Sequence, residues 1–336
     1  MLTKSAKSVV IFSALLALPV FCLIFFNSTR LHLPLFNAFV PEEENLCNDH
    51  SSSIAKCFPK SAFVRRVNAN PPFLMVLPPE GTDASVSHFL YKSERYAPRE
   101  TTIFRLLLEE ACGNAQKTGA RPPLVVDIGA NIGYFTTYAL VMGCRVIAFE
   151  PQPFCQRYLL ASAAINSVGG ESQLTLHKAV VSNATGFVTM SVEKTKSGIN
   201  TGMAKVDKLS ATHEKDSVPS VRLDDVIKLE GDDEIDLLKI DVEGHECAVF
   251  PTMMNLLKTR KIKVLVAEVK STCKEWKKKF FHELRGSYHT QFYPEDYDIE
   301  PNRPGWPYSS WSDVKNQTFT DWFPDHSEDV VFFRKD

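Results

Sequence analysis

Two acidic residues close consecutive predicted strands, and a glycine-containing loop lies between them. Asp127 follows an apolar run, Gly129 and Gly133 come next, and Glu150 ends the second apolar run along the chain. Glycine lets the backbone approach a ligand closely, and carboxylates accept hydrogen bonds from hydroxyl and amino groups. The pattern indicates a nucleotide-like cofactor held at a strand-to-helix turn.

The spacing within this loop narrows the class of cofactor. The loop reads Asp-x-Gly-x-x-x-Gly, with Ala130 and Asn131 between the two glycines. A dinucleotide fold has a glycine at the position of Asn131, where the backbone approaches a pyrophosphate. S-adenosylmethionine has no pyrophosphate, so the loop favours that cofactor. Asn131 could cap the following helix or contact the cofactor carboxylate, and the sequence does not separate the two roles.

A second group of ionisable residues follows another apolar strand. Asp241, Glu243 and His245 lie in the segment DLLKIDVEGHE, residues 236–246, and Glu268 ends the next apolar run. Strand ends of a parallel sheet face one crevice, so these four residues are candidates for a general base or for groups that orient an acceptor.

Alternative roles remain open within this second group. His245 is expected at a helix N-terminus, whose positive dipole end disfavours imidazolium and leaves a neutral, basic nitrogen. The same residue could instead cap the helix or pack in the core. Asp241 could bind the amino group of the cofactor or hold Lys239.

Strands and helices alternate after residue 122, which predicts a parallel sheet with helices on both faces. The predicted strands are Leu124–Asp127, Arg145–Phe149, Leu174–Val180, Ile235–Ile240, Val264–Val269, Tyr288–Phe292 and Val330–Phe333, with Gly186–Val192 also extended. The predicted helices are Pro98–Cys112, Ile132–Met142, Phe154–Asn166, His245–Leu257 and Lys274–Leu284.

Three segments lack this periodicity. Residues 31–92 are rich in Pro, Ser and Asn and are expected to form a stem and an irregular cover. Lys194–Pro219 is polar and is expected to be a mobile loop. The C-terminal part combines several prolines with Trp306, Tyr308, Trp311 and Trp322, which could cover an acceptor or pack in the core.

Composition excludes some function classes. The chain has 336 residues and a formal net charge of -2, so no basic field points to nucleic acid. It has eight cysteines but no C-x-x-C pair, and no metal site is expected. Cys47 and Cys57 could form a disulfide in an oxidising compartment. Cys144, Cys155 and Cys247 are expected as buried thiols, because they fall on predicted core elements.

The N-terminus predicts membrane attachment. The uncharged run Ser8–Phe26 approaches the roughly 20 residues that cross a bilayer, although a cleaved signal peptide is the alternative. Lys4 and Lys7 precede the run, which places the N-terminus in the cytoplasm and the remaining domain in a lumen, the Golgi or the endoplasmic reticulum. Sequons at Asn183 and Asn316 would then meet the glycosylation machinery.

The motifs VVDIGANIGYFT, VIAFEPQP, KAVVS, VRLDDVI and LLKIDVEGHE together resemble the FkbM family of S-adenosylmethionine-dependent methyltransferases. The resemblance covers residues 122–269 and extends loosely to the C-terminus. It implies a class I methyltransferase fold, a Rossmann-like seven-stranded sheet whose last strand is reversed. It also implies O-methylation of a hydroxylated acceptor such as a glycan. The expected organisation is an anchor over residues 1–30, a stem over 31–92 and a methyltransferase domain over 93–336.

Two other classes of function remain open. One is an NAD-dependent oxidoreductase, which the loop disfavours because Asn131 replaces the middle glycine. The other is a membrane-anchored binding protein that has the fold without turnover, although the cofactor loop shows no sign of degeneration.

Overall fold

The computed structural model describes residue 59 and the ranges 61–112, 121–170, 173–195, 198–210, 216–269, 279–280, 282–284, 286–292 and 328–335. The predicted anchor, the Cys47–Cys57 pair and the tryptophan-rich segment lie outside these ranges. Among the described residues, no helix combines the length and the apolar character that a bilayer span needs.

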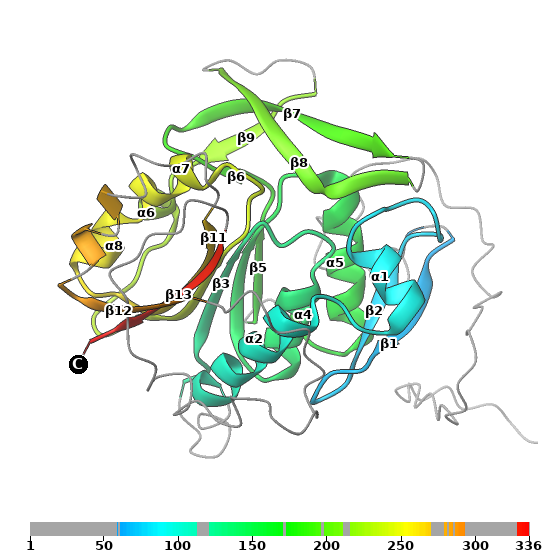
Figure 1. Ribbon diagram of the computed structural model, residues 1–336, viewed down its shortest axis with the longest axis horizontal. Coiled ribbons are helices and arrows are strands. Elements are labelled where there is room, and N and C mark those ends of the chain that lie inside the picture. Colours follow the sequence, from blue (N-terminus) through cyan, green and yellow to red (C-terminus); the bar gives the residue numbers. More distant parts are fainter. Residues whose placement is uncertain are drawn as a thin grey trace, which may run out of the picture. The chain divides into compact units, whose positions relative to one another are not determined.

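A seven-stranded sheet forms the centre of the domain (Figure 1). Its order is β12-β13-β11-β10-β3-β4-β5, and only β13 runs against the other strands. The strands are β3 (Leu124–Ile128), β4 (Arg145–Phe149), β5 (Leu174–His177), β10 (Ile235–Ile240), β11 (Ile262–Val269), β12 (Tyr288–Phe292) and β13 (Glu328–Arg334). The predicted mostly parallel sheet with a reversed last strand is confirmed.

The central strands are apolar on both faces, because helices cover both. All five residues of β3 are buried, and successive side chains enter different cores: Val125 joins one cluster, whereas Leu124 and Val126 join the other. The first core is covered by α2 (Pro98–Ala111), α4 (Tyr134–Val141) and α5 (Pro153–Ile165). The second is covered by α6 (Leu223–Val226), α7 (Glu246–Val249), η2 (Phe250–Thr252) and α8 (Met254–Lys258).

The helix predicted over His245–Leu257 is interrupted. A short 3-10 turn, η2, separates α7 from α8, with Pro251 in its first positions. Proline lacks the N–H that would continue an α-helical ladder, which accounts for the break.

The prediction of an irregular segment over residues 31–92 is wrong for its described part. Strands β1 (Phe63–Val67) and β2 (Phe73–Leu77) form an antiparallel hairpin, and α1 (Val86–Ser93) follows it. The side chains of Val67, Phe73 and Met75 are buried in the first core with those of α4 and α5. The prolines of this region led to the prediction of irregular structure, although two short apolar strands lie within it.

The prediction of a mobile loop over Lys194–Pro219 is also wrong. Half of this segment is β8 (Gly198–Ser210), which pairs with β7 (Gly186–Thr195). With β6 (Val180–Val181) and β9 (Val218–Val221) these strands form a four-stranded sheet, order β6-β9-β7-β8, beside the carboxyl ends of the central strands (Figure 1). The polar composition reflects the exposure of part of this sheet, where side chains such as Lys194, Lys205 and Asp207 meet water.

Two of the three cysteines expected as buried thiols are oxidised. Cys144, just before β4, forms a disulfide with Cys112 at the C-terminal end of α2. Cys247 is disulfide-bonded as well, and Cys155 alone is a buried free thiol as expected. Pairing of Cys112 with Cys144 depends on how α2 packs against the sheet, which spacing in sequence does not reveal.

Candidate functional site

The loop after β3 requires glycine for packing within the protein. Gly129 and Gly133 both have left-handed backbone conformations, with φ of 83° and 86°. A Cβ on Gly129 would meet the backbone oxygen of Asp241, and one on Gly133 would lie 2.6 Å from Cγ of Leu159 in α5. Gly129 lines the pocket described below, whereas Gly133 is not among its lining residues and lies where α4 packs against α5. A close approach of the ligand to Gly133 stays a prediction.

Asp127 lies beneath the loop instead of facing a ligand. Its side chain is 1% exposed, and Oδ2 accepts a hydrogen bond from Thr136 Oγ1 at 2.6 Å. Its other oxygen, Oδ1, lies 3.7 Å from Lys239 Nζ. Asp127 is absent from the pocket lining, and its contact with the cofactor stays a prediction.

Glu150 is held by two backbone donors at the end of β4. Asn131 N donates to Oε2 and Gln152 N donates to Oε1, each at 2.8 Å. The residue is 2% exposed, and burial raises the pKa of its carboxyl to about 7, against the opposing effect of those hydrogen bonds. A carboxylate has about four acceptor positions, so further hydroxyl donors can still be accepted.

The contacts of Asn131 bear on its two predicted roles, capping the helix and contacting the cofactor. Its Oδ1 accepts a hydrogen bond from the backbone N–H of Ile132 at 2.6 Å, which stabilises the entry to α4. No described residue accepts from its Nδ2, although the residue lines the pocket together with Ala130. The two predicted roles are thus compatible: the oxygen shapes the turn, and the amide hydrogens remain for a ligand.

A first pocket lies over the carboxyl ends of β3 and β4 and encloses about 790 Å³ of space that opens to solvent. Gly129, Ala130, Asn131 and Glu150 line one side of it. Its apolar walls are Ile128, Phe149, Val181, Met190 and Val206. Strand β8 adds Thr201, Gly202 and Ala204, which sequence reasoning had missed because it assigned this stretch to a loop.

A second pocket adjoins the first over the ends of β10 and β11. It is lined by carboxylates of Glu100, Asp241, Glu243 and Glu268 and by aromatic side chains of Tyr96, Phe104 and Phe135, with Lys239. The two pockets share Tyr96, Phe135, Lys239, Asp241 and Glu243. Ligands in the two pockets would therefore meet at these shared residues.

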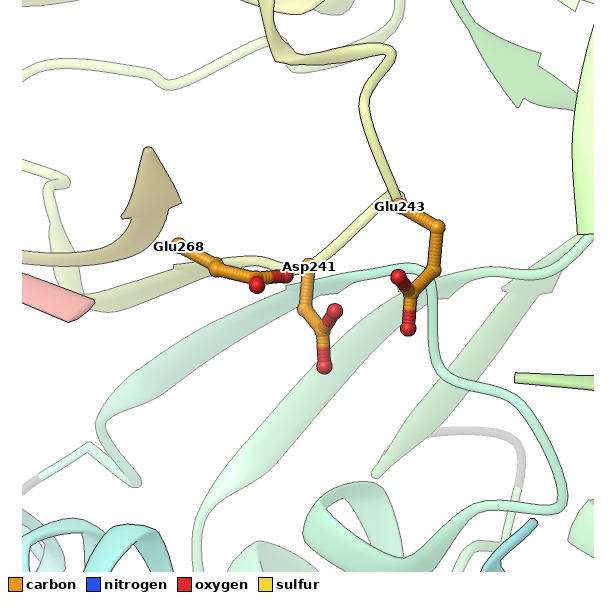
Figure 2. A group of neighbouring side chains, drawn as sticks. All are labelled: Asp241, Glu243 and Glu268. Atoms are coloured by element: carbon orange, nitrogen blue, oxygen red, sulfur yellow. The ribbon is translucent and has the colours of Figure 1, made fainter. Parts of the chain in front are cut away.

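Three of the predicted site residues come together in this second pocket. Carboxylate oxygens of Asp241, Glu243 and Glu268 lie within 4.8 Å of one another. Asp241 follows β10, Glu243 belongs to the next loop, and Glu268 reaches toward them from the adjacent strand β11 (Figure 2). Carboxylate oxygens at this separation can bind a cation as well as a polar substrate. The spacing of the three residues along the sequence did not indicate this possibility.

His245 lines the first pocket, away from Glu268. Its Nε2 lies 3.0 Å from Ser182 Oγ, and burial lowers the pKa of the imidazole. The predicted neutral histidine is supported, but the cause is burial and not the helix dipole, because α7 has four residues.

Lys239 connects the two groups of predicted site residues, the one around the loop after β3 and the one after β10. Its Nζ donates to Asp241 Oδ2 at 3.1 Å and lies 5.0 Å from the ring centre of Phe135. The alternative in which Asp241 holds Lys239 is therefore confirmed. Because the same ammonium faces Asp127, it links the carboxylate under the cofactor loop to the carboxylate at the pocket junction.

Tyr96 is the principal site residue that the sequence did not indicate. It precedes α2, lies far from the recognised motifs, and lines both pockets. Burial raises the pKa of its hydroxyl above the ordinary value, and the charge of Asp241 adds to the effect. Tyr96 consequently stays protonated at neutral pH and can donate a hydrogen bond.

Comparison with known proteins identifies relatives of this chain. Residues 127–290 match the family described as the methyltransferase FkbM domain. Methyltransferase sdnD of Sordaria araneosa is 32% identical over 152 residues, which are 38% of this chain and 59% of sdnD, less than two thirds of that relative. The 31-O-demethyl-FK506 methyltransferase FkbM of Streptomyces tacrolimicus is 30% identical over 195 residues, 50% of this chain and 73% of the relative.

Solved structures include similar proteins at low identity. An rRNA methylase from Streptococcus thermophilus has 11% identity and a TM-score of 0.38, covering 70% of this chain and 96% of its own.

Proposed function

The chain belongs to the FkbM family of methyltransferases, whose cofactor is S-adenosylmethionine, and from this premise we propose that it methylates a hydroxyl oxygen. The observation that carries the proposal is the junction of two pockets at Asp241, Glu243 and Lys239. The first pocket suits the cofactor and the second suits an acceptor. The name of the Streptomyces relative, which specifies an oxygen, supports O-methylation.

The first pocket offers the groups that S-adenosylmethionine requires. Glu150, beside the loop, retains acceptor positions for ribose hydroxyls, and the Asn131 amide faces the pocket as a donor for a carboxylate. The apolar walls, including Met190 and Val206, suit an adenine ring. When bound there, S-adenosylmethionine would supply an electrophilic methyl group on a sulfonium sulfur.

The residues at the junction would position the acceptor and take its proton. Asp241 is oriented by Lys239, and Glu243 and Glu268 lie beside it, so an acceptor hydroxyl meets several carboxylate oxygens. Asp241 and Glu243 are the favoured bases because they line both pockets; Glu268 would hold the acceptor, and His245 would act from the cofactor side. Tyr96, as a neutral phenol, would donate to the acceptor oxygen.

A hydroxyl on a sugar ring suits the second pocket best. The carboxylates would accept hydrogen bonds from neighbouring hydroxyls, and the rings of Phe104 and Phe135, whose centres lie 4.8 Å apart, offer apolar surface for a sugar face. A glycan or another polyhydroxylated molecule is therefore the proposed acceptor, with no role for nucleic acid.

Calorimetric titration of the full-length chain with S-adenosylmethionine and with NAD tests the cofactor. Binding of S-adenosylmethionine alone is expected, whereas binding of NAD alone would favour an oxidoreductase. Turnover is then followed with a methyl-labelled cofactor and a panel of glycans, with the label traced to an ether oxygen. Label on nitrogen or carbon would contradict O-methylation. Cofactor binding with no turnover on any acceptor would favour the binding-protein alternative.

We also propose that the domain resides in the lumen of the secretory pathway, held by the apolar run Ser8–Phe26. Disulfides persist in oxidising compartments, and both Cys112–Cys144 and the oxidised Cys247 are consistent with that location. Asn183 is exposed at the turn between β6 and β7, where a glycan can be attached. Protease protection in intact microsomes and a mobility shift after glycosidase treatment are expected. Digestion from the cytoplasmic side without such a shift would reverse the topology.

A further inference from the structure

A third pocket lies next to the cofactor pocket and is built from different elements. It shares Tyr96 and Tyr134 with the first pocket and encloses about 820 Å³ of space that opens to solvent. Its other walls come from the β1–β2 turn, from the segment between α1 and α2, from the first turns of α2 and from α4. Nothing in the proposed methyl transfer uses these walls.

The charge of this third pocket is opposite to that of the acceptor pocket. Arg95 and Arg105 line it, and its lining contains no carboxylate. Arg105 donates to Glu109 at 2.5 Å through one of its five N–H groups, whereas the guanidinium of Arg95 has no partner within the described part of the chain. At least one full positive charge is thus available to a ligand.

Neutral hydrogen-bonding groups surround the two arginines. Asn68 and Asn70 approach from the hairpin turn, and Thr101 and Thr102 approach from α2. The hydroxyl hydrogens of Thr101 and Thr102 are donated to the backbone oxygens of Tyr96 and Pro98, so the two hydroxyl oxygens serve as acceptors. The donors of the lining are therefore the side-chain amides of Asn68 and Asn70 together with the two guanidinium groups. A planar carboxylate presents two oxygens to one side, whereas a phosphate presents oxygens in several directions, which suits such an arrangement better.

The walls of the pocket are held in place by the fold. Tyr138 donates a hydrogen bond to the backbone oxygen of Asn70 at 2.5 Å and stacks on Phe73 with ring centres 5.1 Å apart. Thr101 Oγ1, in α2, donates to the backbone oxygen of Tyr96 at 2.7 Å and lies 3.2 Å from the hydroxyl oxygen of Tyr134 in α4. Because these contacts join the hairpin, α2 and α4, the pocket exists before any ligand arrives.

We propose that this third pocket is a phosphate-binding site in which Arg95 and Arg105 provide the charged contacts. The phosphate is either free or an ester on a larger molecule. The site goes beyond the proposed methyl transfer and does not depend on it. Tyr96 is the wall common to all three pockets, so the bound phosphate lies against the residue that also faces the acceptor.

Titration of the full-length chain with inorganic phosphate tests the site, with potassium chloride at equal ionic strength as the blank. Saturable binding is expected, and acetate should bind more weakly. Arg95→Gln and Arg105→Gln should each weaken phosphate binding about tenfold, the usual effect of losing a charge-assisted hydrogen bond. The matched control is Arg157→Gln on the exposed side of α5, which should bind like the unmodified chain.

Parallel measurements separate the possible outcomes. Urea unfolding of each variant guards against misfolding, above all for Arg105→Gln, which also loses the Glu109 contact. Glycerol 2-phosphate distinguishes the source: binding at least as tight as that of inorganic phosphate indicates an ester, and weaker binding indicates the free anion. The proposal is overturned if phosphate gives no saturable signal, or if Arg95→Gln binds phosphate as Arg157→Gln does. A titration with S-adenosylmethionine in the same samples shows independently whether the cofactor site is intact.

Discussion

The ammonium nitrogen of Lys239 lies 3.1 Å from a carboxylate oxygen of Asp241, and the same nitrogen lies 3.7 Å from Asp127. Lys239 is almost fully buried, so its charge is shared between a carboxylate under the cofactor loop and one at the pocket junction. Lys239 is therefore expected to contribute both to the stability of the fold and to the chemistry of the site.

Replacing Lys239 by methionine should destabilise the fold. The change would leave Asp127 as a buried charge without its counter-ion, a defect that typically costs about 3–5 kcal/mol in the free energy of unfolding. Urea unfolding measures the loss, and Lys258→Met, at an exposed position in α8, is the control, with an expected effect within about 0.5 kcal/mol. Adding Asp127→Asn should restore part of the stability. Equal stability of the two lysine variants would show that the buried pair contributes little.

Cofactor affinity should depend on pH through Glu150. Its pKa is raised to about 7 by burial, and the ionised form accepts hydrogen bonds from hydroxyl groups better than the protonated form. Affinity for S-adenosylmethionine should thus be full near pH 8 and should fall as pH drops below about 7.

Variants of Glu150 provide the test of that pH dependence. Glu150→Gln should bind about tenfold more weakly at pH 8 and should lose the dependence, since one charge-assisted hydrogen bond is removed. Glu230→Gln, at an exposed position, is the matched control. Calorimetry at pH 6, 7 and 8 measures both effects. Unchanged affinity in a folded Glu150→Ala protein would remove Glu150 from the cofactor site.

Asp241 and His245 should matter for turnover more than for stability. A general base usually contributes about 10²–10⁴-fold in rate, so Asp241→Asn and His245→Ala should lose activity while melting within a few degrees of the unmodified chain. Asp232→Asn, an exposed residue, serves as the control. Normal activity per folded molecule together with lost stability would instead assign His245 to packing.

The lowered pKa of His245 also predicts where activity should decline on the acidic side of the pH–rate profile. Because burial lowers the pKa of His245, the neutral imidazole persists below the ordinary value of about 6.5. At saturating S-adenosylmethionine, where the pH dependence of cofactor binding does not limit the rate, activity that depends on the neutral form should accordingly fall only at more acidic pH. Ser182→Ala should reproduce part of the His245→Ala defect if the 3.0 Å contact orients the ring. An activity loss already centred above pH 7 would contradict this reading.

Gly133→Ala should weaken the fold and not the cofactor contact. The new Cβ would lie within 3 Å of two Leu159 side-chain atoms, and the left-handed backbone adds strain of about 1–2 kcal/mol. Gly170→Ala is the control, since a Cβ there meets nothing within 4 Å. Thermal unfolding and calorimetry are compared for both. If a Gly133→Ala chain of normal stability binds the cofactor weakly, the glycine is needed for the close approach of the ligand.

The sequence by itself determined the central sheet and the motif-bearing strand ends. Strands such as Arg145–Phe149 and Ile235–Ile240 are predominantly apolar, because most of their side chains are buried, and their ends are marked by local residues such as Glu150 and Asp241. Signals that lie within ten residues of one another were sufficient for these elements.

Only the tertiary structure decided which distant residues complete the site. Tyr96 comes from a segment before α2, β8 supplies a wall through pairing with β7, and Glu268 reaches Asp241 because β10 and β11 are neighbours in register. The same holds for the Cys112–Cys144 disulfide and for the contact that explains Gly133. Each of these depends on packing between elements far apart in the chain, and local residue patterns do not encode such distances.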